Sequence, residues 1–526
     1  MSGGFSGLNT SLTGLFSASR KLDVINHNVG NANTPGYSRQ VAVQEAVRPY
    51  PVFDGSGMAG KGSYVSSIDR VRNEYMDMRY WSQNQVKGDS SVKEKMLMDI
   101  EGILGEPSES GITTVMNEFF NSLHDLNKEP SNASARSAVL QNAITFTRYF
   151  NSIAGNLDKF QAEINQNVSS TVKEINSLGN QIAKLNKQIF DFEVSGNIAN
   201  DLRDKRTYLI DQLSGLVDTD VQEVVRGTLP NGSPDVRTVI RVAGEVFVDD
   251  TKTEELELFA RGEKLNDEDI PDIYEVKWPN GRMVEVKSGE LNGYLSSRDG
   301  NSGVNGSPNF KGIPFYKSKL DEFVQTFAKA FNEGTESALG HASGYGMATG
   351  ENPPTSGIRF FTPSGGNEQG LDTESFLDGA QNKEEVESRY DNLTARNFSV
   401  SKDILDGYFN IATSTDPDFS GNSDIVKDLI GLRHDIGLFE EGAPEDFYRN
   451  IVTTLAVDLQ QAKRISDNSQ IILSLTENRR LSESGVSIDE EMADMIKQQQ
   501  AYSASASLIN TWGEIYDILI NRTGLR

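Results

Sequence analysis

A heptad pattern in the last part of the chain restricts its fold more than any other feature. From about residue 487 to residue 521, side chains recur at alternating steps of four and three, and most of them are apolar. They are Ile488, Met492, Met495, Gln499, Tyr502, Ala506, Ile509, Gly513, Tyr516 and Ile520. This spacing is that of a coiled-coil helix, whose apolar face needs another helix to cover it. Ser487, with Glu490 three residues later, is a capping box that begins the helix.

The first segment of the chain, residues 5–29, repeats this pattern at the opposite end. Its heptad positions are Phe5, Leu8, Leu12, Leu15, Ser19, Leu22, Asn26 and Val29. The other face carries mostly small uncharged residues, such as Ser6, Ser11 and Ser17, whereas a solvated helix normally carries charges there. Small residues permit the close approach of a second helix. We therefore expect the two terminal helices to pair with each other or with a neighbouring copy, which is the architecture of an assembling protein.

An asparagine-rich stretch follows the first helix. Asn26, Asn28, Asn31 and Asn33 precede Pro35-Gly36-Tyr37. Asparagine and glycine tolerate left-handed backbone, and Pro-Gly is a turn pair, so the helix must end within this stretch. Turn geometry and contacts with a partner both account for the asparagines, and the two are compatible.

Helical spacing returns after an extended arm or small hairpin over residues 41–68. It predicts a helix over 69–104 and a long helix whose apolar stripe runs from Ile153 to Ile189. A further helix begins at Pro444, and its stripe, which continues to Leu475, is long enough to pair with 153–189. These segments predict an elongated helical bundle.

The periodicity changes to two between about 221 and 290, which indicates strands. A hairpin is predicted over 274–286 with Asn280-Gly281 in its turn. The region 334–424 is read as loops and hairpins. The expected fold is mainly α with inserted β: terminal coiled-coil helices, an elongated helical bundle with small β parts, and a small β domain. The predicted domains are 1–45 with 485–526, 46–220 with 310–484, and the insert 221–309.

Composition argues against several functions. The chain of 526 residues holds 50 Lys and Arg against 76 Asp and Glu, a net charge of −26, which disfavours nucleic acid and anionic membranes as partners. There is no cysteine, and the four histidines, His27, His124, His341 and His434, are dispersed, so no metal site is expected. No apolar run is long enough to span a bilayer, and no secretory signal is recognised.

No catalytic or cofactor motif is found either. The acidic runs 254–255, 267–269 and 489–491 stand at a helix start or in polar loops, where solvated carboxylates are expected. We therefore predict no catalytic residue, no cofactor and no metal.

The two ends resemble a known family. The segments Leu8–Leu15 and Leu22–Tyr37 resemble the N-terminal motif shared by bacterial flagellar rod, hook and hook-associated proteins. Ser484–Ala493 and Gln498–Ala506 resemble their C-terminal motif. Rod and hook proteins usually continue with Lys after the Gly-Tyr pair. Here Ser38-Arg39-Gln40 follows, which is similar to the hook-associated members, as are the stretches 200–213 and 289–295. His27 and Gly30 depart mildly from the Asn and Ala that relatives often carry.

The resemblance implies a secreted, extracellular structural subunit of the flagellum at the junction of hook and filament, without enzymatic activity. It implies export through the flagellar type III apparatus and assembly into a ring of roughly eleven copies. The implied partners are the hook protein, a second hook-associated junction protein and through it flagellin, and a chaperone on the last helix. The assembly interface is predicted at Leu8, Leu12, Leu15, Leu22, Asn26, Asn28, Asn31, Asn33, Pro35, Gly36, Tyr37, Met492, Met495, Gln499, Tyr502, Ala506, Ile509 and Tyr516.

Two alternatives remain open at this point. The chain could be a hook or rod protein of the same family, although the Ser38-Arg39-Gln40 continuation disfavours this. It could also be an enzyme, such as a wall hydrolase, carried by the insert 221–309 on a flagellar scaffold.

Overall fold

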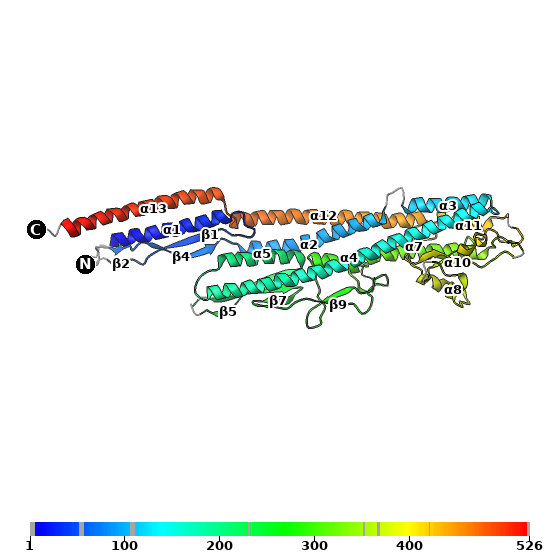
Figure 1. Ribbon diagram of the computed structural model, residues 1–526, viewed down its shortest axis with the longest axis horizontal. Coiled ribbons are helices and arrows are strands. Elements are labelled where there is room, and N and C mark those ends of the chain that lie inside the picture. Colours follow the sequence, from blue (N-terminus) through cyan, green and yellow to red (C-terminus); the bar gives the residue numbers. More distant parts are fainter. Residues whose placement is uncertain are drawn as a thin grey trace.

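The protein is a long, mainly helical rod with both chain ends at one extremity (Figure 1). The computed structural model describes residues 6–51, 57–105, 111–229, 232, 234–350, 353–365, 369–419 and 421–522. Phe5, the first predicted heptad position, lies outside these ranges. The long terminal helices pack together and small antiparallel sheets are inserted between helices, which confirms the predicted fold class. The predicted three-part domain division stays a prediction.

The terminal helices α1 (Ser6–Asn31) and α13 (Ile488–Asp517) pair antiparallel. Three contacts fix their register. Gly7 lies against Trp512, Gly14 against Ser505, and Asn28 against Glu491. Successive contacts are separated by whole heptads on both helices. Ser487 caps α13 through a bond from the Glu490 backbone N–H to its hydroxyl, at 3.4 Å, as its place in the capping box predicts.

The contact face of this pair differs from the predicted one. On α1 the contacting positions Gly7, Gly14 and Asn28 each precede a predicted heptad position by one residue, and the leucine row is only partly buried. On α13 the predicted positions Gln499 and Gly513 are exposed. Glycine and serine let the two backbones approach closely, whereas a row of leucines would hold them apart. The closest approach of the two helices is therefore made at the small residues, and the leucine row of α1 lies to one side of it.

A β-hairpin covers a second face of α1, and it is one of the two forms, extended arm or small hairpin, predicted for residues 41–68. Its outer strands pair antiparallel, and the Ser17 hydroxyl donates to the Ser63 carbonyl at 3.1 Å. The strands are β1 (Gln40–Ala46), β2 (Tyr50–Pro51), β3 (Met58–Ala59) and β4 (Ser63–Arg70).

Two long helical pairings make the rod. Helix α12 (Pro444–Ser484) packs along α2 (Glu74–Leu104), and not along the 153–189 segment as predicted. That segment belongs to α4 (Ala133–Glu193), whose apolar stripe is covered by α5 (Asn200–Leu216), by α6 and α7, and by the β insert. Phe247 of the insert, for example, packs against Gly179 of α4. The insert thus occupies the face that α12 would need.

The β insert consists of a four-stranded antiparallel sheet and a separate two-stranded one. The predicted turn at Asn280-Gly281 is present, with Gly281 at φ 82° and its N–H bonded to the Trp278 carbonyl. The two sides of this turn meet at an isolated β-bridge between Lys277 and Met283. The strand that leads into the turn, β10, forms its ladder with β9 and not with residues 283–286. The strands are β5 (Thr219–Thr228), β6 (Pro234–Val242), β7 (Glu245–Asp249), β8 (Lys252–Thr253), β9 (Glu257–Ala260) and β10 (Tyr274–Lys277).

An aromatic core fills the end of the rod far from the termini. Phe119 stacks on Phe146 at 5.5 Å between ring centroids, and Phe361 lies 4.9 Å from Phe398. The last two lie on the paired strands β11 (Phe361–Pro363) and β12 (Phe398–Val400), so part of the predicted loop region 334–424 is core. The remaining elements are α3 (Ile112–Lys128), α6 (Glu290–Asp299), η1 (Val304–Gly306), α7 (Ile313–Glu333), η2 (His341–Ser343), α8 (Thr373–Leu377), α9 (Lys383–Ser388), η3 (Arg389–Asn392), α10 (Lys402–Asp406), η4 (Tyr408–Asn410), α11 (Asp424–Gly431), η5 (Leu432–His434) and the π-helix η6 (Ile518–Arg522).

Candidate assembly interface

A buried polar cluster joins the terminal helix pair to the rod, and we call it the joint. It draws on α1, the loop after it, β4, α2, α5, α12 and α13, which are far apart in sequence. Its residues are Asn28, Tyr37, Ser38, Arg39, Arg70, Arg72, Asp77, Asp204, Asp211, Arg480 and Glu491.

Asn28 is an asparagine of this stretch whose side chain makes tertiary contacts. Its Nδ2 donates to the Gln40 carbonyl at 2.9 Å and to Glu491 Oε2 at 3.1 Å. Its Oδ1 accepts from the Gln40 backbone N–H at 2.9 Å and from the Tyr37 hydroxyl at 2.8 Å. These bonds use the full capacity of a buried amide. Asn31 instead serves the turn, since its Nδ2 donates to the His27 carbonyl at 3.0 Å.

Glu491 and Arg39 tie the beginning of α13 to the loop after α1. Glu491 is only 2% exposed, and Arg39 Nε donates to its Oε1 at 2.7 Å. The Arg39 backbone N–H also donates to the Ser484 carbonyl, at 2.8 Å, where α12 ends. A carboxylate in the first turn of a helix is favoured by the helix dipole. One arginine thus fixes the angle between α12 and α13.

The turn Gly36-Tyr37-Ser38 packs against α5 and so connects the loop after α1 to the rod. Gly36 has φ 76°, and a Cβ at this position would lie 2.8 Å from Cβ of Tyr208 on α5. The Ser38 backbone N–H and hydroxyl donate to the two oxygens of Asp204, at 2.8 and 2.9 Å. Burial, with Asp201 nearby, raises the pKa of the Tyr37 hydroxyl well above its usual range, so that it stays a donor.

Arginine–aspartate pairs complete the joint. Arg72 Nε lies 2.7 Å from Asp77, and a second Arg72 nitrogen donates to the Ser38 hydroxyl at 2.9 Å. Arg480 of α12 lies 2.8 Å from Asp211, to which Trp81 Nε1 donates at 2.7 Å. Burial raises the pKa of Asp211 to about 6, although Arg480 opposes the shift. Buried pairs of this kind specify geometry more than they add stability, because desolvation offsets their attraction.

Most of the joint is not predicted by the sequence. The acidic run at 489–491 has the pattern of solvated carboxylates, yet Glu491 is buried. Asp269 of the 267–269 run is also only 2% exposed and bonds to Gln161 Nε2 at 2.9 Å. One signal in the sequence indicates part of the joint. Asp204 and Asp211 lie seven residues apart on one face of α5, together with Thr207 and Ser214, and all four are buried.

The predicted interface residues separate into two groups. Asn28, Gly36 and Tyr37 belong to the joint or its turn, and their contacts lie within the chain. The others lie on the terminal pair or the loop beside it. Asn26, Asn33, Pro35, Met492, Gln499 and Tyr502 are exposed, whereas Leu8, Leu12, Leu15, Leu22, Asn31, Met495, Ala506, Ile509 and Tyr516 are partly buried.

Several large apolar side chains of the terminal pair are exposed, and together we call them the terminal apolar face. Phe16 of α1 is 64% exposed, and Ile488, Met492, Ile496 and Leu508 of α13 are 50%, 44%, 55% and 53% exposed. Exposed apolar area of this extent marks a surface that another molecule covers.

The described part of the chain contains no helix long and apolar enough to cross a membrane. Within the same residue ranges, no group of three or more histidine or acidic side chains is placed to hold a metal ion. An elongated rod with an uncovered face on its paired terminal helices is a structural subunit built for assembly.

Comparisons with known proteins agree with this class. The model of the flagellar hook-associated protein FlgK helical domain matches residues 97–352, and that of the flagellar basal body rod FlgEFG protein C-terminal matches 477–522. The chain is 30% identical to flagellar hook-associated protein 1 of Bacillus subtilis over 100% of this chain and 99% of that protein. It is 29% identical to the Salmonella typhimurium protein of the same name over 42% of this chain and 40% of that one. A solved structure of the flagellar hook junction protein FlgK from Burkholderia pseudomallei matches with a TM-score of 0.41 and 18% identity, over 56% of this chain and 47% of that one.

The full-length similarity decides the family. The chain belongs to the flagellar hook-associated protein 1 family. It is a structural protein of the bacterial flagellum and not an enzyme, and this family, rather than the hook or rod proteins, is the one it matches over its whole length.

Proposed function

We propose that the protein forms the junction between hook and filament, and that its copies assemble through the terminal apolar face. The observation that carries this proposal is the choice of contact residues between α1 and α13. The chain pairs α1 with α13 through Gly7 against Trp512, Gly14 against Ser505 and Asn28 against Glu491. It leaves Phe16, Ile496 and Leu508 more than half exposed.

The energetics favour burial of this face between copies. Complete burial of a Leu, Ile or Met side chain contributes about 1.5–3 kcal/mol, and the side chains concerned on α13 are roughly half exposed. Ile488 (50%), Met492 (44%), Ile496 (55%) and Leu508 (53%) together therefore offer about 4 kcal/mol per copy. Association entropy offsets part of this gain. A closed ring helps, since every copy then has two neighbours.

The remaining partners follow from family membership and from the shape of the rod. The hook protein is the neighbour on one side, and a second hook-associated junction protein, which precedes flagellin, is the neighbour on the other. A ring of roughly eleven copies would match a tubular neighbour. The three-part division assigns assembly to the termini (1–45 with 485–526), spacing to the rod (46–220 with 310–484), and a lateral role to the insert (221–309).

Export and chaperone binding concern the same surface. The subunit would leave the cell through the flagellar type III export apparatus. Before export, the exposed apolar side chains of its last helix need to be shielded from water. Ile518, Leu519 and Ile520 are 48%, 61% and 68% exposed at the end of this helix. A chaperone with an apolar groove fits this segment.

Deletion of the gene tests the junction role. Cells should make bare hooks and secrete unpolymerised flagellin, whereas normal filaments would reject the proposal. Met492→Glu tests the face itself, with Gln500→Glu on an exposed polar position of α13 as the control. The Met492→Glu monomer should keep its melting temperature and fail to restore filaments, because the added charge is buried only on assembly. The control should restore them. A lower melting temperature for Met492→Glu would show that this side chain is buried within the chain.

A further inference from the structure

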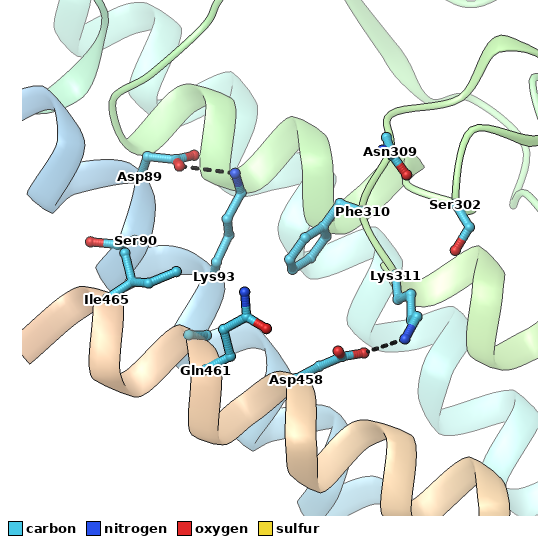
Figure 2. Close-up of a pocket in the computed structure, with 11 residues that line it drawn as sticks. Asp89, Ser90, Lys93, Ser302, Asn309, Phe310, Lys311, Asp458, Gln461 and Ile465 are labelled. Atoms are coloured by element: carbon cyan, nitrogen blue, oxygen red, sulfur yellow. Dashed lines mark hydrogen bonds and ion pairs between the residues drawn. The ribbon is translucent and has the colours of Figure 1, made fainter.

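A groove lies in the middle of the rod between α2, α12 and the loop before α7 (Figure 2). Its cavity volume is about 350 Å³. The Phe310 ring projects from the loop toward Lys93 of α2, and Ile465 of α12 lines the groove on the far side of Lys93. A salt bridge stands at each end: Lys93 lies 2.9 Å from Asp89, and Lys311 lies 3.0 Å from Asp458. We call this site the Phe310 groove.

The chemistry of the groove suits an apolar side chain. Each lysine is neutralised by its aspartate, and Lys93 also lies 5.4 Å from the centroid of the Phe310 ring. The groove therefore offers no free charge for a small ion. A cavity of about 150 Å³ holds a benzene ring, so this groove has room for one aromatic side chain. Ile465 is 45% exposed, although it belongs to the predicted apolar stripe of α12.

An exposed aromatic side chain stands on the β insert. Phe259 of β9 is 43% exposed, and β9 pairs with β10 alone. Glu257 lies two residues earlier, so it is on the same face of the strand, about 7 Å away. Glu257 is exposed, and no salt bridge is formed by it among the described residues. Lys277 Nζ of β10 lies 5.6 Å from the centroid of the Phe259 ring, and the rest of the ring is open to solvent. A partly exposed aromatic residue beside an exposed carboxylate on a short strand is a surface suited to contact with a partner.

The two sites lie on opposite edges of the rod. In Figure 1 the middle of α12 runs along one long edge and β9 lies along the other, at the same level. In a ring, each copy meets its neighbours through two different surfaces, one on either side. We propose that Phe259 of one copy inserts into the Phe310 groove of the next copy. Glu257 then lies near the ends of the groove, where Lys93 and Lys311, each bonded to one aspartate, have further N–H donors for its carboxylate. This contact rests on the ring assembly proposed above and adds a specific lateral contact to it.

The absence of cysteine from the chain permits a direct test. The double variant F259C/Q461C places one thiol on β9 and one on the rim of the groove. A disulfide requires Cα atoms within about 7 Å, so only an inserted residue 259 can react. A260C/Q461C is the matched control, because Ala260 is exposed on the other face of β9. Flagella are isolated and oxidised, and the junction protein is separated by non-reducing electrophoresis.

The expected result is a ladder of cross-linked multimers in flagella from F259C/Q461C cells, at least about tenfold stronger than in the control and absent from soluble monomer. The pair F259C/I465C should behave alike. Filaments that grow normally without the ladder would overturn this inference and leave the junction role intact. Cross-links with Q461C alone would also overturn it, because two grooves would then face each other. Absence of the protein from flagella of wild-type cells would instead reject the proposed function.

A variant that fails to enter flagella is also informative. If F259C does not assemble, F259L should assemble and F259D should not, because the groove accepts an apolar side chain and excludes a charge. Equal assembly of the Leu and Asp variants would refute the contact.

Discussion

Removal of the buried carboxylate of Glu491 should release the terminal helix pair from the rod without unfolding the rod. The Glu491 side chain is 2% exposed and accepts from Arg39 Nε at 2.7 Å and from Asn28 Nδ2 at 3.1 Å. In Glu491→Ala both bonds disappear, and Asn28 keeps its bonds to Gln40 and Tyr37.

The expected cost is about 2 kcal/mol. Hydrogen bonds to charged groups contribute about 1.5–3 kcal/mol each. The Arg39 side chain is 25% exposed and also lies 3.5 Å from Glu490 and 3.8 Å from Asp494, so water and these acids compensate part of the loss. A change of 2 kcal/mol corresponds to an opening constant raised about 30-fold.

Hydrogen exchange of the α13 amides in the purified monomer measures this opening. Exchange in the first turns of α13 should become about 30-fold faster in Glu491→Ala, while amides in α4 keep their rates. Glu490→Ala is the control. The Glu490 side chain is 67% exposed, and loss of such a surface pair costs at most about 1 kcal/mol. Equal rates in the two variants would refute the reasoning, as would α13 amides that are unprotected in the wild-type protein.

Two further predictions concern the rod. Gly88→Ala should destabilise it by about 1–3 kcal/mol, because a methyl group there would overlap the carbonyl of Gly215 on α5, and backbone cannot move aside. Gly102→Ala on the same helix meets nothing within 4 Å and should instead stabilise by about 0.5–1 kcal/mol; calorimetry distinguishes the two, and equal melting temperatures would contradict the packing argument. Burial lowers the pKa of His341 to about 4. Its Nε2 accepts from the Ala412 N–H at 2.8 Å and so must stay unprotonated. Since the unfolded histidine titrates near 6.5, the unfolded state binds the proton first, and about 3 kcal/mol of stability should be lost as the pH falls from about 6.5 to 4. Denaturant titrations at several pH values measure this loss, and His341→Asn should flatten the slope; an unchanged slope would contradict the assignment.

Local periodicity predicts where the helices lie along the chain. It does not predict which segments pack against each other. The terminal helices, the α4 stripe and the β insert all appear where the sequence places them, because each pattern is carried by one segment. The contacts of α1 with α13 fall on Gly7 and Gly14, one residue before the predicted heptad row. The sequence leaves open whether that row is covered within the chain or by a neighbouring copy. In an assembling protein, an apolar row on a helix need not pack in the chain's own core, because another copy can cover it.

The joint and the aromatic core could not be predicted for a different reason. Arg39 and Glu491 are brought together only by the complete fold, and neither lies in a pattern that names its partner. Likewise Phe360, Phe361 and Phe398 come from short segments of the region 334–424 that show no long periodic pattern, yet all are fully buried. Pairings between distant segments depend on tertiary packing, which a single sequence does not display.

The register of the terminal pair has a mechanical consequence. Its layers are spaced by whole heptads, and they are held by small or polar side chains such as Gly14 and Ser505. A force that separates the free ends of α1 and α13 sideways would break these layers one at a time and meet little resistance. A force along the helix axes must break all of them together, and the joint anchors the other end. The subunit is therefore stiff under axial load and easily opened from its tip.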